Sequence, residues 1–395
     1  MASINLGGKK RGNSVIGGLI FGVILFFGSF VLLWWNEGDA VAQFKAIGAL
    51  NKNTVEVTAE SVDPQQDGLP VYVSANANTT EELRDDVFDI GSVALKLTRK
   101  AEMYQWEEDE RTDSDTDKKT YSYSKTWSSR HIDSSGFHDK SYKNPPNKPY
   151  NDKSETAKNA SLGAARKLPP FLINDLNNFT KLSAADSNPD IAGIKHHDGG
   201  FYIGADPSSP EIGDMRIRFS VIEPGVVSLI AEQTGPSFKS WTAPNERKIH
   251  EISPGVHSKA DLIKELQTKA RIKLWILRGV GFGMMYFGIL CLLSPLSKLA
   301  GFIPFLGDRL QSGVAAIGFF IAAILSLMTI MVAWIAHRPL VGISILVVIA
   351  GLIFLLVRAV KSGSETRTAV AGGGPDLPPP PPAPTNDEPP PPPPA

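Results

Sequence analysis

The side chains with the clearest capacity for chemistry form the run His196-His197-Asp198. Imidazole and carboxylate groups ligate zinc, but a site needs several of them converging on one point. Neighbouring side chains on a strand point to opposite faces, and the sequence offers no second cluster of ligands near this run. We therefore predict neither a metal site nor a cofactor.

A second group, His131, Asp133, Ser134 and Ser135, has the composition of an acid–base–nucleophile set. Such a set depends on spatial geometry, and these serines lack the glycine-flanked turn that exposes a catalytic serine. A hydrogen-bonded turn explains them better. The acidic segment 107–117 lacks the spaced glycine and closing glutamate of a calcium loop and is typical of a solvated hairpin tip. We predict that the protein is not an enzyme.

Aromatic side chains form a third candidate surface. Two alternating segments, 94–106 and 121–127, predict a hairpin of paired strands. They share an aromatic set: Tyr104, Trp106, Tyr121, Tyr123 and Trp127. Their cross-strand contacts would form either a buried sheet core, which we favour, or an exposed face for self-association.

The elements that hold these groups are set by four uncharged apolar runs, at residues 15–35, 279–297, 310–336 and 339–357. A helix needs about 20 apolar residues to cross a bilayer core, where its backbone polar groups must all be paired internally. The runs predict four membrane-spanning helices in a 1 + 3 arrangement, with one large domain between the first and the second.

The whole chain divides accordingly. The predicted segments are a cytoplasmic N-terminus (1–13), transmembrane helix 1 (14–35), an ectodomain (36–272), transmembrane helix 2 (273–297), an interfacial or re-entrant loop (298–311), transmembrane helices 3 (312–336) and 4 (339–358), and a disordered cytoplasmic tail (359–395). Basic residues before the first span and after the last place both termini in the cytoplasm.

The ectodomain has a mixed pattern, for which we predict an α+β fold rich in sheet. Further strands are expected at residues 201–204, 214–222 and 226–233. Good helix formers predict a helix at 154–165. A last helix begins at Ser258, with Asp261 completing its cap, and meets no breaker before the second span. The one cysteine, Cys291, lies in that span, so no disulfide supports the domain.

Small residues recur in two spans, with Gly18 and Gly22 in the first and Gly279 and Gly283 in the second. Glycine lets helices approach closely, so this spacing predicts helix packing and assembly into a homo-oligomer. The other expected partners are membrane lipids and further membrane proteins. A net charge of −1 gives no electrostatic case for nucleic acid.

The tail from Gly372 holds 13 prolines in its last 21 residues. Proline lacks the backbone donor that helices and sheets require, which predicts disorder or polyproline II. The runs Pro378–Pro382 and Pro389–Pro394 would suit an adaptor module with an aromatic groove. An inert solubilising tail is the interpretation that we favour.

Several short motifs occur in order along the chain: Trp35-Asn36-Glu37-Gly38, Glu102-Met103-Tyr104-Gln105-Trp106, Tyr121–Trp127, Lys143-Asn144-Pro145, Gly213-Asp214-Met215-Arg216-Ile217 and Arg338-Pro339. With the 1 + 3 spans, they resemble the transmembrane protein 43 family. The resemblance implies a multi-pass protein of internal membranes or of a bacterial envelope, without established catalytic residues. In nucleated cells it implies a scaffold that self-associates and contacts nuclear-envelope proteins. The proline-rich tail departs from the family pattern.

We therefore predict a non-enzymatic, multi-pass membrane scaffold that organises membrane or envelope complexes through its ectodomain. Two alternatives stay open: an oligomeric channel or transporter built from the C-terminal helices, and an envelope enzyme that acts through the ectodomain. Brevity and the lack of an ordered retention signal favour a bacterial inner membrane. An endomembrane or nuclear-envelope location is expected if the chain is eukaryotic.

Overall fold

The computed structural model describes residues 8–112, 118–300 and 307–338, together with 351 and 354. The chain divides into two compact units, Met1–Ser326 and Leu327–Ala395. Apart from residues 351 and 354, the predicted fourth span and the proline-rich tail lie outside the described residues.

Three helices in the described part of the chain are long and apolar enough to cross a membrane. The helices are α1 (Gly8–Asn53), α3 (Lys259–Ala300) and α4 (Gly307–His337), with candidate spans over Gly17–Asn53, Lys259–Leu293 and Ala315–His337. They correspond to the first three predicted spans. The predicted loop at 298–311 is largely taken up by the ends of α3 and α4, and residues 301–306 lie outside the described residues.

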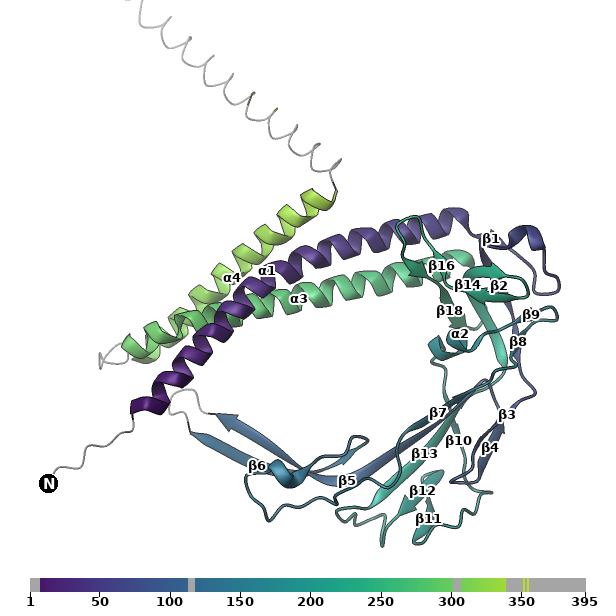
Figure 1. Ribbon diagram of the computed structural model, residues 1–395, viewed down its shortest axis with the longest axis horizontal. Coiled ribbons are helices and arrows are strands. Elements are labelled where there is room, and N and C mark those ends of the chain that lie inside the picture. The colour runs from purple at the N-terminus through teal and green to yellow at the C-terminus, as the bar shows by residue number, and fades with distance from the viewer. Residues whose placement is uncertain (1–7, 113–117, 301–306, 339–350, 352–353, 355–395) are drawn as a thin grey trace, which may run out of the picture. The chain divides into compact units, whose positions relative to one another are not determined.

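Neither α1 nor α3 stops where its apolar part ends, and the two helices lie side by side (Figure 1). At about 1.5 Å per residue, the segment from Asn36 to Asn53 extends α1 by roughly 27 Å. By the same rise, the segment from Lys259 to Lys273 accounts for about 22 Å of α3. The predicted cap is confirmed, since Asp261 N donates to Ser258 Oγ at 3.2 Å and Ser258 N donates to Asp261 Oδ2 at 3.1 Å. We call the two polar segments, 36–53 and 259–273, the helical stalk.

The domain between α1 and α3 contains two seven-stranded sheets. The first has the order β15-β14-β2-β8-β9, with β1 on β2 and β18 on β14; the second has the order β11-β12-β13-β5-β6, with β10 on β13 and β7 on β5. The strands of the first sheet are β1 (Val55–Glu56), β2 (Pro70–Asn78), β8 (Ser161–Leu162), β9 (Arg166–Lys167), β14 (Gly225–Thr234), β15 (Ser237–Lys239) and β18 (Glu251–Pro254). Those of the second are β5 (Lys96–Thr112), β6 (Lys119–Ser128), β7 (Lys153–Thr156), β10 (Thr180–Leu182), β11 (Ile194–His197), β12 (Gly200–Ile203) and β13 (Met215–Ile222).

Smaller elements complete the domain. They are the pairs β3 (Glu82–Asp85) with β4 (Ile90–Val93) and β16 (Trp241–Thr242) with β17 (Lys248–Ile249), the short helix α2 (Pro170–Asp175), and the 3-10 turns η1 (Pro64–Gln66) and η2 (Ser134–Gly136). This composition confirms the predicted α+β fold.

One hydrophobic core draws on both sheets, with Val73 and Leu229 from the first and Leu97 and Phe219 from the second. A short turn at residues 223–224 joins the consecutive strands β13 and β14. However, β13 pairs with β5 and β14 pairs with β2, so the turn carries the chain from one sheet to the other. Alternation along each strand does not reveal this change of sheet, because both strands present apolar residues to the same core.

A second core joins the stalk to the first sheet. Ile47 and Leu50 of α1 and Leu262 of α3 are buried with Ile230 of β14 and Trp241 of β16. The stalk is therefore part of the folded domain rather than a linker beneath it. Because α1 and α3 are continuous, their apolar parts and the domain belong to the same unit.

The helix predicted at 154–165 is wrong. Residues of β7 pair with β5 and those of β8 pair with β2, while Ala157 and Ala160 between them are buried. Helix propensities are worth less than about 1 kcal/mol per residue, so strand pairing and burial override them. The local helix is instead α2, which begins at Pro170, and proline at the first helical position needs no backbone donor.

The predicted hairpin is confirmed and is longer than expected. β5 continues to Thr112 and pairs with β6 in a register that sets Tyr104 opposite Trp127 and Glu110 opposite Tyr121. Part of the acidic segment predicted as a turn is thus a strand, and residues 113–117 lie outside the described residues. Charged side chains on an exposed strand discourage that strand from pairing with the edge strand of another sheet.

Candidate functional site

Polar residues join α1 and α3 where their apolar parts end. Glu37 is 2% exposed, and Arg278 donates to both of its carboxylate oxygens, from Nε at 2.7 Å and from Nη2 at 2.9 Å. Asn36 Nδ2 donates to the Leu274 carbonyl at 3.1 Å. A bidentate bond of this kind fixes both the separation and the rotation of the two helices.

The hairpin β16–β17 is bound at the same place. Asp39 accepts hydrogen bonds from Lys273, at 3.0 Å, and from Arg247, which immediately precedes β17. Arg247 also donates to Gln43 at 3.2 Å, and Asn245 Nδ2 donates to the Ala42 carbonyl of α1. We call the residues Asn36, Glu37, Asp39, Arg247, Lys273 and Arg278 the polar junction.

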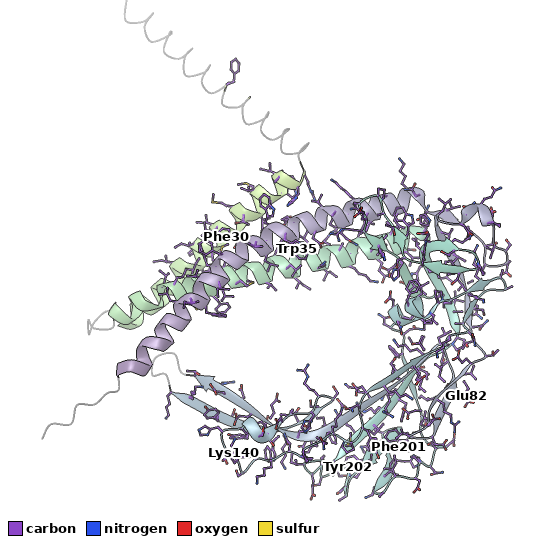
Figure 2. The ribbon with its side chains drawn as sticks, viewed as in Figure 1. Phe30, Trp35, Glu82, Lys140, Phe201 and Tyr202 are labelled. Atoms are coloured by element: carbon purple, nitrogen blue, oxygen red, sulfur yellow. The ribbon has the colours of Figure 1, made fainter. Side chains whose placement is uncertain are left out.

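Tryptophan side chains surround this junction. Lys273 lies over the Trp35 ring at 5.7 Å and Arg278 over the Trp275 ring at 4.8 Å, and both rings are exposed (Trp35 is labelled in Figure 2). Tryptophan beside cations is the usual composition at the boundary of a bilayer. The junction therefore lies at the level where the helices leave the apolar layer.

Close packing of α1 on α3 depends on glycine. A Cβ at Gly22 would lie 2.7 Å from Cys291 Cβ, and a Cβ at Gly288 would lie 2.7 Å from the Phe26 nitrogen. Contacts this short leave no room for a side chain. Gly22 was among the glycines for which close helix packing was predicted.

The other glycines singled out by spacing lie elsewhere on the helices. A Cβ at Gly18, Gly279 or Gly283 would meet no described atom within 4 Å. These positions do not form the contact between α1 and α3 within one chain. A role in contacts between chains stays a prediction for them.

Substitution of Gly288 with valine is expected to destabilise the pairing of α1 with α3 by about 1–3 kcal/mol through overpacking. Gly48→Val is the matched control, since it makes the same change at an open position in the polar part of α1. The measurement is unfolding in mild detergent. Equal stability of the two variants would show that α1 does not approach α3 at Gly288.

The five predicted aromatic residues share one face of the hairpin but are neither core nor bare surface. All are half-buried, and Tyr104 packs on Trp127 with 5.0 Å between ring centroids. A following segment, residues 131–144, covers the others. Tyr142 stacks on Tyr123 at 3.9 Å, and His138 stacks on Tyr121 at 4.1 Å.

Asn144 holds that covering segment in place. Its Oδ1 accepts from the Trp106 nitrogen at 2.7 Å, and its Nδ2 donates to the Trp106 carbonyl at 2.9 Å. The Asn144 side chain thus bonds both backbone polar groups of Trp106, as a neighbouring strand would. The aromatic face is largely used within the chain, and only part of each ring is left for a partner.

The candidate chemical groups are separated by the fold. His196 and His197 lie on opposite faces of β11, against Phe201 and Tyr202 respectively. Among the described residues, no group of three or more His, Cys, Asp or Glu side chains is placed to hold a metal ion.

The histidine, aspartate and serines at 131–135 form local structure. Asp133 caps η2 by accepting from Ser135, and His131 bonds the Pro145 carbonyl. These bonds hold the covering segment over the hairpin, as expected of a hydrogen-bonded turn.

Sequence reasoning missed one hydrogen-bonded chain. His250 lies between Ser240 Oγ, 3.0 Å from Nδ1, and Asp175 Oδ2, 2.8 Å from Nε2. The residue types match an acyl-transfer triad, but serine and carboxylate occupy the opposite nitrogens and Asp175 is 54% exposed. These hydrogen bonds link α2 to the hairpin β16–β17, at the rim of a cavity of about 490 Å³ beside the stalk.

Comparisons with known proteins agree with the motifs. The family described as Transmembrane protein 43 matches residues 103–339, more than half of the chain. The chain is 29% identical to the transmembrane protein 43 of Rattus norvegicus and of Homo sapiens, over 84% of this chain and 87% of each relative. It is also 29% identical to the Drosophila melanogaster homolog, over 83% of this chain and 90% of that one.

No solved structure matches the chain. The matched family region contains the hairpin β5–β6, most of both sheets, the whole of α3 and α4, and one partner, Arg278, of the central ion pair. The resemblance seen in the motifs is confirmed. This multi-pass membrane protein belongs to the transmembrane protein 43 family.

Proposed function

We propose that the protein is a non-enzymatic membrane scaffold that self-associates and organises membrane complexes through its ectodomain. The supporting observation is the continuity of α1 and α3, which pass from the apolar layer into the core of the domain. The polar junction prevents the helices from rotating against each other. Lateral association of helices therefore sets the position and orientation of the ectodomains.

The contacts between copies are proposed to use the open glycines of α1 and α3, Gly18, Gly279 and Gly283. Exposed apolar side chains flank them, including Ile20 and Val280. Small residues between larger apolar ones allow close approach of helices in lipid.

The test is the mass of the full chain in nanodiscs or mild detergent at micromolar concentration, together with crosslinking in native membranes. More than one copy per particle is expected, and Gly283→Leu should reduce that number. The matched control is Gly136→Leu, because Gly136 is equally open but lies in the ectodomain. A strictly monomeric protein, or equal effects of both substitutions, would contradict the proposal.

The channel and enzyme alternatives gain less support. A conduction path usually needs ionisable groups facing a cavity at mid-depth. The charged groups described on α1 and α3 at the membrane boundary, Glu37 and Arg278, bind each other instead. Solute flux in proteoliposomes would revive the first alternative, and substrate turnover by the purified chain would revive the second.

The proposed topology has both termini in the cytoplasm and the domain on the opposite side. The basic residues that precede the first span support this orientation. The membrane is proposed to be a bacterial inner membrane, or an endomembrane in a eukaryotic cell. Protease protection of sealed vesicles tests the orientation. In vesicles whose cytoplasmic face points outward, the ectodomain should be protected, and its cleavage there would reverse the proposed orientation.

A further inference from the structure

Basic side chains cluster on the outer face of the second sheet. They are separate from the polar junction, both in sequence and in the contacts of the described residues. On β13, Met215, Ile217 and Phe219 face the core, so Arg216 and Arg218 face outward. The register sets Arg216 opposite Glu102, Arg218 opposite Lys100, and Ser220 opposite Lys181. We call Lys100, Lys181, Arg216 and Arg218 the cation patch.

The patch has too little negative charge of its own. One buried carboxylate, Glu102, receives Arg216 at 2.6 Å, Lys100 at 3.3 Å and Arg218 at 3.6 Å. Burial favours the neutral acid, but the bonds and charges of Arg216 and Lys100 outweigh it and lower the pKa of Glu102. Glu102 and the exposed Asp198, which lies 3.9 Å from Arg218, are two carboxylates against the four cations of the patch.

The arrangement of Arg218 is costly in itself. Like charges directly opposite each other on paired strands are destabilising, and Arg218 stands opposite Lys100. Its nearest carboxylate oxygens belong to Glu102, at 3.6 Å, and to the exposed Asp198, at 3.9 Å. Among the described residues, none forms a hydrogen bond with its guanidinium, which has five N–H donors.

Arg216 is different, because it donates a hydrogen bond to a buried carboxylate and packs on an aromatic ring. It bonds Glu102 and lies over the Trp127 ring at 4.6 Å. Nearby, Tyr202 donates to Asp214 at 2.5 Å, and burial together with Asp214 raises the pKa of Tyr202. Asp214 is therefore occupied and does not serve as a counter-charge for Arg218.

The patch is hollowed. A cavity of about 510 Å³ is walled by Trp127, Tyr202 and two prolines, with Arg216 and Arg218 at its side (Tyr202 is labelled in Figure 2). A second cavity, of about 300 Å³, is lined by Lys100 and Lys181. The two share Arg218 and Asp198, so they adjoin.

We propose that this double cavity binds a small phosphate-bearing anion. Phosphate oxygens would accept hydrogen bonds from Arg218, with Lys100 and Lys181 adding charge, and the larger cavity would hold the organic part against Trp127 and Tyr202. A doubly charged phosphate suits this cation excess better than a single carboxylate does. Arginine is well matched to such oxyanions through its planar array of donors.

The experiment uses the full chain in phosphatidylcholine nanodiscs, with pyrophosphate as the soluble probe at constant ionic strength. Saturable binding by calorimetry and a matching rise in unfolding temperature are expected. Arg218→Gln should weaken that binding at least tenfold. Arg111→Gln, which makes the same change at a highly exposed site on β5, should leave it unaltered.

Loss of folding would imitate loss of binding, so stability without phosphate is measured as well. Arg218→Gln removes a like-charge pair, and its unfolding temperature in phosphate-free buffer should be no lower than that of the parent. A lower value would contradict the assigned cost of the Arg218–Lys100 pair. It would remove one of the supports of the proposal.

A second probe separates the two sources of phosphate. Vesicles of phosphatidylcholine with phosphatidate are compared with vesicles of phosphatidylcholine alone for capture of the nanodisc-borne protein. Capture that depends on Arg218 identifies a lipid headgroup, whereas pyrophosphate binding without capture identifies a soluble ligand. Binding of neither probe, or equal binding by Arg218→Gln, would overturn the proposal.

Discussion

Replacing Glu37 with alanine is expected to cost roughly 3–5 kcal/mol of folding free energy. The carboxylate is almost completely buried and accepts both hydrogen bonds from Arg278. Its removal leaves the guanidinium of Arg278, which is largely buried, without its carboxylate partner. The measurement is reversible unfolding in mild detergent, followed by tryptophan fluorescence, since Trp35 and Trp275 lie beside the pair.

An exposed ion pair provides the control for this prediction. Glu155 bonds Lys153 at 2.9 Å with both side chains well exposed, so Glu155→Ala should cost at most about 1 kcal/mol. Replacing Glu37 and Arg278 together with leucine should recover much of the lost stability, because no unpaired charge then remains. If Glu37→Ala were no more harmful than Glu155→Ala, the pair would not hold the helices together.

Ile47→Ala is expected to cost about 2–5 kcal/mol and to loosen the ectodomain, although Ile47 lies in α1. The side chain is fully buried against the first sheet and α3, and its loss leaves a cavity in the core that joins stalk and domain. Limited proteolysis of the ectodomain loops and detergent unfolding would measure the two effects.

The control for Ile47 is an apolar residue that packs on little. Val256 is 78% exposed, so Val256→Ala should be nearly neutral. If the Ile47 variant resisted proteolysis as well as the Val256 variant, the domain would fold independently of α1. The stalk would then be a simple tether.

Much of the architecture follows from local pattern. The spans are visible because lipid tolerates no unpaired backbone, which forces long uncharged runs. The hairpin is visible because Tyr121, Tyr123 and Trp127 alternate with polar residues over a whole strand. The start of α3 is visible because Ser258 and Asp261 cap each other through bonds only three residues apart.

The wrong predictions concern segments whose structure is set by contacts with residues far away in the sequence. The segment 154–165 has helix-forming residues, yet β7 and β8 are strands because β5 and β2 pair with them from far along the chain. The covering of Tyr123 by Tyr142 likewise depends on how a loop folds back. Short-range periodicity contains no information about either contact.

Charged sites could not be predicted for a similar reason. Arg278 lies near the start of an apolar run, but its partner Glu37 lies 241 positions earlier. Arg218 and Lys100 are unremarkable in separate segments, and only the register of β13 on β5 sets them opposite each other. Chemistry of this kind depends on pairing across the fold, which a single sequence does not reveal.

Because Glu37 and Arg278 are far apart in sequence, Glu37 is synthesised well before its partner. A ribosome delivers α1 to the membrane while the chain still lacks α3, so during that interval the carboxylate has no counter-ion and Ile47 has no complete pocket. A nascent polypeptide that terminates before Leu262 keeps both defects permanently. We therefore expect products truncated within the ectodomain to be less stable than the full chain.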